Sequence, residues 1–399
     1  MIEKYYSGVI EQIYNRIGKE TRNIVMANYS NDFSIENLEV IRRYQSNEDN
    51  VFFAYSEFSY NTLVGAYEPF LDIICNMHRR FIGGSFDDFQ KECGVYYLHR
   101  QVLNSYYETG ECFREETVLL NEVAYEQRRM TMAIADMLKK LSEVKPLMIV
   151  INRFQMASKS SIETIKYLID NPCANIGIVL GVNAIVKGTD STVEVWDRIV
   201  ESLEDRSAIY YIGSAGPLKN NVKTTNDDEL YITMNFEQSI QEASNIMEFL
   251  DFEQARRGCR IIEHKLKFED AWIDEKSLRR FYMVYARTSV LLGEMSKAIE
   301  LTNEYKALIP ENDSEHYLSL YYFMKGTCYM YQGKLEKAGN SAKSAYDYAV
   351  LAEDDTLIFK AELLSVMIKM SGWYNIFFCV QDIPCLLYTS PSPRDLSTS

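Results

Sequence analysis

The sequence has no long apolar run, no closely spaced cysteine pair and only four histidines, and each shortage excludes a class of protein. Its longest mostly apolar stretch, residues 175–186, falls well short of the ~20 residues that cross a bilayer, and the chain begins without a basic-then-apolar leader. The eight cysteines are scattered without a C-x-x-C pair, which argues against a disulfide framework or a thiolate zinc site. The histidines are too far apart in sequence to suggest a metal cluster. We expect a cytoplasmic protein with no metal site and no membrane partner.

Charge and composition narrow the choice further. The net charge of −15 gives a field that repels phosphate backbones, so nucleic acid is not expected as a direct partner. With 399 residues, 47% of them apolar and 13% aromatic, the chain can bury two or three ordinary hydrophobic cores. We therefore expect a globular protein of more than one domain.

Helical and strand patterns alternate from Met1 to about Gly213. Apolar strands separated by helices predict an α/β domain with a parallel sheet that is covered on both faces. The five expected strands are "NIVMA", "VFFAYSEF", "PLMIVI", "NIGIVLGV" and "AIYYIG".

After the loop "SAGPLKNNVKTTNDDE" the strand signals stop and a helical repeat begins. Ala255, Ala298, Ala338 and Phe377 follow one another at spacings of 43, 40 and 39 residues, and Gly293, Gly333 and Gly372 lie five residues before the last three. This pattern resembles tetratricopeptide repeats, in which a Gly ends the first helix and an Ala packs inside the second. The resemblance implies an all-α superhelix of stacked helix pairs with a concave surface. A generic helical bundle is the alternative.

The octet "INRFQMAS", residues 151–158, follows an apolar strand and leads into a helix. It resembles the octet "IDDLQWAD" of STAND proteins, signalling ATPases related to the AAA+ group that often carry helical repeats. Four positions keep the packing and the turn: Ile151, Phe154, Gln155 and Ala157. Three replace the acids: Asn152, Arg153 and Ser158. The resemblance therefore implies a P-loop NTPase-like framework without the carboxylates that hold Mg²⁺ and position water.

A phosphate loop of the form G-x-x-x-x-G-K-[ST] is expected after the first strand, and only "ANYSNDFS", residues 27–34, lies there. Ala27 and Asp32 occupy the glycine positions, Phe33 replaces the lysine, and Ser34 alone matches. Glycines let backbone N–H groups turn toward phosphates, and lysine neutralises them. We expect no catalytic residue, no ATP hydrolysis and no cofactor; weak binding of ATP or ADP without turnover is an alternative. The degenerate nucleotide-site positions are Asn28, Ser30, Asp32, Phe33, Ser34, Asn152, Arg153 and Asn183.

The segment "CLLYTSPSPRDLSTS", residues 385–399, resembles an in-frame translation of a sequencing adapter over its first eleven residues. A natural Ser/Pro tail is the alternative. The resemblance predicts a disordered tail after a repeat array that stops near Pro384. An array without a capping helix exposes apolar surface, here Trp373 to Phe378, so self-association through this end is expected.

These patterns predict three segments: a degenerate ATPase-like domain at 1–225, helical repeats at 236–384 and the tail. The resemblance implies a regulator of signalling or transcription in which an inactive ATPase-like module is joined to repeats that bind a protein or small ligand, with an output domain beyond the sequence. An active or nucleotide-switched ATPase and a stand-alone repeat adaptor are the alternatives. Partner contact is expected through tyrosines, which bury large area with little rotamer loss, although packing between repeats is an equal alternative. These are Tyr317, Tyr321, Tyr322 and Tyr329.

Overall fold

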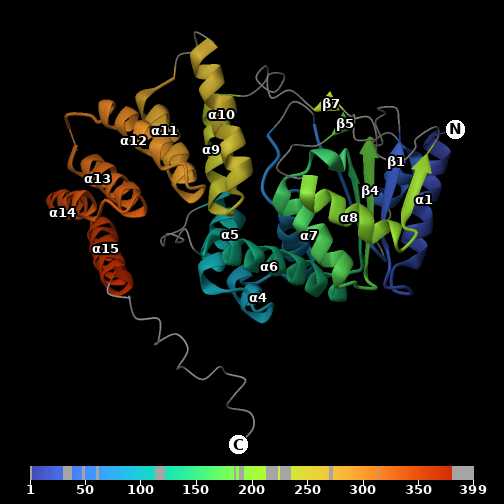
Figure 1. Ribbon diagram of the computed structural model, residues 1–399. Helices are drawn as coiled ribbons and strands as arrows, with labels where there is room; N and C mark the ends of the chain where they lie inside the picture. Colours follow the sequence, from blue (N-terminus) through green and yellow to red (C-terminus); the bar gives the residue numbers. More distant parts are fainter. Residues whose placement is uncertain are drawn as a thin grey trace, which may run out of the picture. The chain divides into compact units, whose positions relative to one another are not determined.

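The computed structural model describes residues 2–29, 38–46, 50–59, 63–112, 122–183, 186–187, 193–212, 223–224, 235–268, 273–312 and 314–379. The chain divides into two compact units, Met1–Ile273 and Asp274–Ser399. The first unit is built around a parallel sheet, and the second consists of helices (Figure 1).

Five strands form the main sheet, in the spatial order β2-β3-β4-β1-β6, and every neighbouring pair is parallel. They are β1 (Ile24–Tyr29), β2 (Phe52–Glu57), β3 (Leu147–Asn152), β4 (Ile176–Asn183) and β6 (Ile209–Ile212). A short parallel pair, β5 (Val186–Lys187) with β7 (Lys223–Thr224), lies outside this sheet. Every residue of β3 and β4 is buried, as expected for central strands with both faces covered. The predicted parallel α/β sheet is confirmed.

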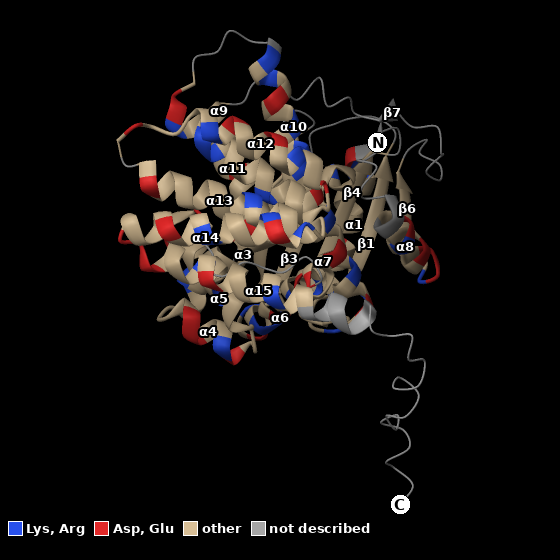
Figure 2. Cartoon of the chain, turned by 60° about the vertical axis from the view of Figure 1, so that its left-hand side comes forward, with Lys and Arg blue, Asp and Glu red and all other residues tan. Residues whose placement is uncertain are grey.

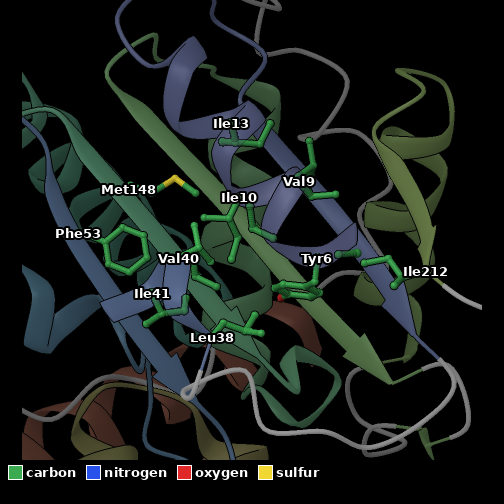
Figure 3. Packing of buried hydrophobic residues seen from close by; sticks show 14 of the residues in the cluster. Tyr6, Val9, Ile10, Ile13, Leu38, Val40, Ile41, Phe53, Met148 and Ile212 are labelled. Carbon is green, nitrogen blue, oxygen red and sulfur yellow. The ribbon is translucent and has the colours of Figure 1, made fainter. Parts of the chain in front are cut away.

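One face of the sheet is covered by α1 (Ile2–Arg16) and α2 (Glu39–Ser46). Apolar residues recur along α1 at helical spacing, so a single stripe of the helix is buried against the strands. Figure 3 shows this stripe facing Phe53, Met148 and Ile212 of the sheet. The shared core includes Tyr6, Val9, Ile10 and Ile13 of α1, Val40 and Ile41 of α2, and Val25, Phe53, Met148, Val179 and Ile212 of the sheet.

The opposite face carries α7 (Lys159–Asp170) and α8 (Val193–Glu204), with α6 (Val123–Val144) packed on α7 (Figure 1). The ring of Phe154, directly after β3, lies 5.8 Å from the ring of Trp196 on α8. Between β2 and α6 the chain forms α3 (Phe70–Met77), a π-helical turn (His78–Ile82), α4 (Phe86–Glu92) and α5 (Tyr97–Thr109). The helices on this side come from the crossovers that return the chain to each next parallel strand.

The helix pair α9 (Phe236–Glu248) and α10 (Phe252–Phe268) belongs to the first unit, although the sequence pattern grouped it with the repeats. Hydrogen bonds explain the difference. The Gln127 side chain donates to the carbonyl of Leu250 at 2.6 Å, and the Gln254 side chain donates to that of Val64 at 3.0 Å. The compact units therefore divide after Ile273 rather than in the loop before residue 236.

The second unit consists of antiparallel helix pairs joined by short turns. Its helices are α11 (Glu275–Leu291), α12 (Met295–Ala307), α13 (Ser314–Tyr331), α14 (Leu335–Leu351) and α15 (Asp355–Cys379). Gly293 and Gly333 end α11 and α13 in the left-handed region, at φ 78° and 72°. The residue after each glycine donates back five residues, from Glu294 to Ser289 and from Lys334 to Tyr329. The two turns repeat the same cap 40 residues apart, as the glycine spacing predicts.

The third predicted turn is absent, because α15 runs unbroken through Gly372. Glycine permits a left-handed cap but does not require one, and a helix interior tolerates it at a cost of about 1 kcal/mol. The predicted inner alanines Ala255, Ala298 and Ala338 are all fully buried. No helix within the described part of the chain is long and apolar enough to span a bilayer.

Candidate functional site

The polar residues that follow the apolar parts of the strands meet at the carboxyl edge of the main sheet. Register places Glu57 beside Asn152, and Tyr29 beside Asn183. Parallel strands end at a common edge, and ligands of open α/β sheets bind outside that edge. Because side chains alternate along a strand, Tyr29, Glu57 and Asn152 continue the face that α1 covers.

The centre of this edge is a buried hydrogen bond. The hydroxyl of Tyr29 donates to Oδ1 of Asn152 at 2.6 Å, and neither residue is accessible to solvent. Asn152 stands at the first acid position of the octet. An amide there carries no charge, and this contact uses one of the two lone pairs of its oxygen.

The second acid position holds Arg153, which pairs with an acid from the neighbouring strand. Its guanidinium lies 3.1 Å from Oε1 of Glu57, and both side chains are about one-fifth exposed, at 21% and 18%. The hydroxyl of Tyr55 donates to the other oxygen of Glu57. Arg153 also has a left-handed backbone, φ 54°, which turns the chain sharply at the end of β3. The carboxylate at this edge is therefore ion-paired with an arginine and accepts a hydrogen bond from a phenol.

Tyr6 of α1 closes the same region from above the sheet. Its ring meets that of Tyr29 edge to face at 6.4 Å. Burial raises the pKa of Tyr6 well above its ordinary value, and the nearby Tyr29, Tyr55 and Glu57 raise it further. The hydroxyl is therefore neutral at physiological pH. We call this set, Tyr6, Tyr29, Tyr55, Glu57, Asn152 and Arg153, the carboxyl-edge cluster.

Two further predicted positions lie at the same edge. The backbone N–H of Asn183 donates to Oε1 of Gln155 at 3.2 Å, and both residues are buried. This bond fixes the turn after β3 to the end of β4. Asn28, in β1, is also buried, and its Oδ1 accepts no hydrogen bond from the described residues.

The structure corrects the start of the expected phosphate loop. Ala27 and Asn28 are paired strand residues, in register with Gly181 and Val182, and β1 continues to Tyr29. The apolar pattern breaks at Asn28, but the backbone ladder does not, since the asparagine is accommodated inside the fold. The remaining predicted loop positions, Ser30, Asp32, Phe33 and Ser34, lie outside the described residues.

The cluster is poorly equipped for metal-assisted phosphate chemistry. Mg²⁺ prefers charged oxygen ligands in octahedral geometry, and the cluster offers a hydrogen-bonded amide and an ion-paired carboxylate. Within the described ranges no group of three His, Cys, Asp or Glu side chains could hold a metal ion. The arrangement is suited to holding the ends of three strands together.

The third acid position, Ser158, begins α7. Its hydroxyl accepts from the N–H of Ser161 at 3.4 Å, an ordinary helix cap. In the same first turn, the N–H of Ser160 donates to the carboxylate of Asp251 at 3.1 Å. Lys159 lies 3.3 Å from Glu253. The turn after β3 is thus connected directly to the start of α10.

The tyrosines expected to face a partner differ in exposure. Tyr321 is buried; its hydroxyl accepts from Lys325 at 2.8 Å, and Lys306 of α12 lies over its ring. Tyr322 is half-buried and stacks on Tyr348 of α14, with ring centroids 5.6 Å apart. Tyr321 and Tyr322 therefore contribute to packing between helices.

Tyr317 and Tyr329 are half-buried and lie under basic side chains, Arg279 and Lys337 respectively. Acidic and basic residues are interspersed along the helices of this unit (Figure 2). The side chains at 373–378, from which self-association is expected, lie outside the described ones. Earlier in α15, one face leaves exposed Phe359, Leu363, Val366 and Met370.

The sequence patterns missed Tyr6, Tyr29, Tyr55 and Glu57. A signal for Glu57 was present, because the mostly apolar strand "FFAYSE" ends on an acid at the edge where parallel strands end together. Its partner Arg153 lies 96 positions later in the chain, so the pair could be found only from the strand order.

Comparisons with protein-family models, with curated proteins and with solved structures found no match to this chain. The function must therefore be argued from the geometry of its residues.

Proposed function

We propose that the first unit is an ATPase-like scaffold that does not hydrolyse ATP, and that the second unit is a tetratricopeptide-like array that binds a protein partner. The observation that carries this proposal is the hydrogen bond from Tyr29 to Asn152, at the position where an ATPase of this type requires a free carboxylate. The proposed role is that of a scaffold in signal transduction rather than that of an enzyme.

The chemistry of hydrolysis supports this reading. Phosphoryl transfer from ATP depends on Mg²⁺, and the protein must hold the ion and orient a water molecule. Asn152 contributes no charge for the ion. Glu57 is paired with Arg153 and Tyr55, so both of its oxygens already have partners within the fold. Weak binding of ATP or ADP without turnover is compatible with this arrangement.

A scaffold role also requires a connection from the sheet edge to other elements. Gln155 ties the turn after β3 to β4, and Ser160 at the start of α7 is bonded to Asp251 before α10. A displacement at the edge would therefore be transmitted to the start of α10 through these two hydrogen bonds and the first turn of α7. This path lies entirely within the first unit.

Protein binding by the array is supported by its helix pairs with repeated glycine caps. The half-buried Tyr317 and Tyr329 are available as anchors, because each keeps part of its ring exposed beside a cation.

A phosphate-release assay with Mg-ATP tests the first half of the proposal on the full chain. We expect no release above background, and the same result for Asn152→Ala and Arg153→Ala. Turnover by the unmodified chain that disappears in Asn152→Ala would overturn the proposal. Titration calorimetry with ATP adds a second reading: any binding should be unaffected by Mg²⁺, whereas strong Mg²⁺ dependence contradicts a site without a metal ligand.

The second half is tested by comparing partner capture by full-length variants. Tyr317→Ala with Tyr329→Ala should lose proteins that the unmodified chain recovers. The matched control is Tyr346→Ala, an exposed tyrosine on α14. Equal recovery by all three chains would place the contact elsewhere.

A further inference from the structure

A cavity of about 360 Å³ lies between α9 and the segment that leads into α3, within the first unit. Three of its lining side chains are acids, Glu68, Asp72 and Glu242. Two are aromatic, Tyr106 of α5 and Phe249 after α9, whose rings meet edge to face at 5.5 Å. No lining residue is basic, and all of them belong to the described part of the chain. The carboxyl-edge cluster contributes nothing to this cavity.

The acids converge at a point where the backbone carries no side chain. Gly65 donates its N–H to Oε2 of Glu68 at 2.9 Å. A Cβ placed on Gly65 would lie 2.8 Å from Oε1 of Glu242 and 3.4 Å from Oε2 of Glu68. The two carboxyl groups, one on α9 and one before α3, therefore approach the same atom of the chain.

Asp72 adds a third acid, and its charge is only partly offset. The hydroxyl of Tyr106 donates to Oδ1 of Asp72 at 3.0 Å. The other polar groups facing the cavity are Gln238 and Asn245 of α9, both neutral, and α10 supplies no lining residue. Repulsion between these acids acts across the contact between α9 and residues 63–72.

The proximity of these acids, together with burial, favours the protonated form of the two glutamates. Burial raises the pKa of Glu242 to about 7, and the nearby Glu68 and Asp72 raise it as well. Burial also raises the pKa of Glu68, to which Asp72 adds, against the opposing effect of the Gly65 N–H. One carboxyl of this group is thus protonated below neutrality, when it can share its proton with another.

We propose that Glu242 and Glu68, beside the charge of Asp72, form a proton-dependent latch that holds α9 against residues 63–72 when protonated and loosens it when ionised. The latch is independent of the function proposed above, since it involves neither nucleotide nor partner. It makes the seating of the α9–α10 pair sensitive to pH in the physiological range.

The direction follows from proton linkage. A free glutamate has a pKa near ~4.3, so the seated helix binds more protons than the released one between that value and about pH 7. The stabilisation is complete below the lower value and is lost as pH rises through the upper one. One linked proton changes the seating equilibrium by up to about tenfold per pH unit within this window.

Hydrogen–deuterium exchange of the full chain, corrected to protection factors at each pH, tests the latch. The protection of α9 should fall by up to about tenfold per unit from pH 5 to 7 and level off above 7. Glu242→Gln, which cannot ionise, should remove most of this fall, and Glu242→Gln combined with Glu68→Gln should keep α9 protected at every pH. Glu68→Gln removes a neighbouring charge and should shift the fall to lower pH.

The control is Glu237→Gln, which changes an exposed acid in the first turn of the same helix and should reproduce the unmodified curve. Protection of β3 and β4 should not follow the change in α9. A flat curve for α9 in the unmodified chain would overturn the proposal. So would a curve for Glu242→Gln combined with Glu68→Gln that still falls between pH 5 and 7.

Discussion

The hydroxyl of Tyr29 reaches Asn152 at 2.6 Å although β1 and β3 are not neighbours in the sheet. The strand between them is β4, so the bond spans three strand ends on the face that α1 covers. The contact satisfies a buried amide and joins the ends of strands that are not neighbours.

Removing this hydroxyl should be costly. In Tyr29→Phe the oxygen of Asn152 loses a donor while it stays buried, which should lower the free energy of unfolding by about 1–3 kcal/mol. Urea denaturation of the full chain measures the change. Tyr5→Phe, at a tyrosine that is 61% exposed, is the control and should change it by less than about 0.5 kcal/mol. Equal effects of the two substitutions would show that the buried bond adds no stability.

The pair between Glu57 and Arg153 should be coupled energetically. Each side chain is about one-fifth exposed, so solvent screens the pair only in part, and we expect a coupling of about 1 kcal/mol. A double-mutant cycle of Glu57→Gln and Arg153→Gln in urea denaturation measures it. The coupling should weaken at high salt. Additive effects would mean that the two groups act independently.

Two glycines of the second unit should respond in opposite directions to the same substitution. Gly333 has φ 72°, so Gly333→Ala should lower stability by about 1 kcal/mol. Gly339 lies inside α14, and a Cβ there meets nothing within 4 Å. Gly339→Ala should therefore raise stability by about 0.5–1 kcal/mol. Thermal unfolding compares the two, and the same sign for both would contradict the cap.

The strands were predictable because their apolar runs are bounded by turn residues, and the five predicted segments all overlap strands of the sheet. The helix caps at Gly293 and Gly333 were predictable because they are local: the hydrogen bond that closes each one spans only five residues of the chain. Gly372 shows the limit of this inference, since a glycine's freedom does not state which conformation it takes.

Only two of the six residues of the carboxyl-edge cluster were predictable. Asn152 and Arg153 were found from a resemblance, but their partners Tyr29 and Glu57 come from other strands. Pairing across strands depends on their spatial order, which no local pattern encodes. The placement of α9 and α10 could not be found locally either: their helical pattern fits a repeat, and long-range hydrogen bonds such as that of Gln254 tie them to the first unit.

Buried thiols should report on the division of the chain. Burial raises the pKa values of Cys75 and Cys328 to about 12, and it raises that of Cys259 as well. At pH 8 the thiolate fraction at these sites should be roughly a thousandfold below that of a free cysteine, so labelling in the folded protein should be slow. In rising urea, Cys75 and Cys259 should become reactive together, because both belong to the first unit. Mass spectrometry of labelled peptides measures this. If Cys259 became reactive together with Cys328 instead, α10 would unfold with the helices of the second unit and not with the first.

Asp251 caps two helices at once, and its loss should be felt at both. One carboxylate oxygen accepts from the N–H of Ser160 at the start of α7 at 3.1 Å, and the other accepts from the N–H of Gln254 in α10 at 3.4 Å. Each lost cap costs typically about 1 kcal/mol, so Asp251→Ala should lower the free energy of unfolding by about 2 kcal/mol. Asp251→Asn keeps one acceptor oxygen and should cost about half as much. Glu253→Gln is the matched control, since its pair with Lys159 is more than one-quarter exposed and contributes less than about 1 kcal/mol.

Hydrogen–deuterium exchange distinguishes a shared cap from two separate ones. In Asp251→Ala the first turns of α7 and α10 should lose protection together, because the same carboxylate holds both. Their loss should leave the protection of α1 unchanged, since that helix packs on the opposite face of the sheet. Loss of protection in α10 alone would mean that Asp251 is an ordinary cap of its own helix. The connection from the turn after β3 to the α9–α10 pair would then have to pass through Lys159 and Glu253, and Glu253→Gln should loosen the start of α7 in its place.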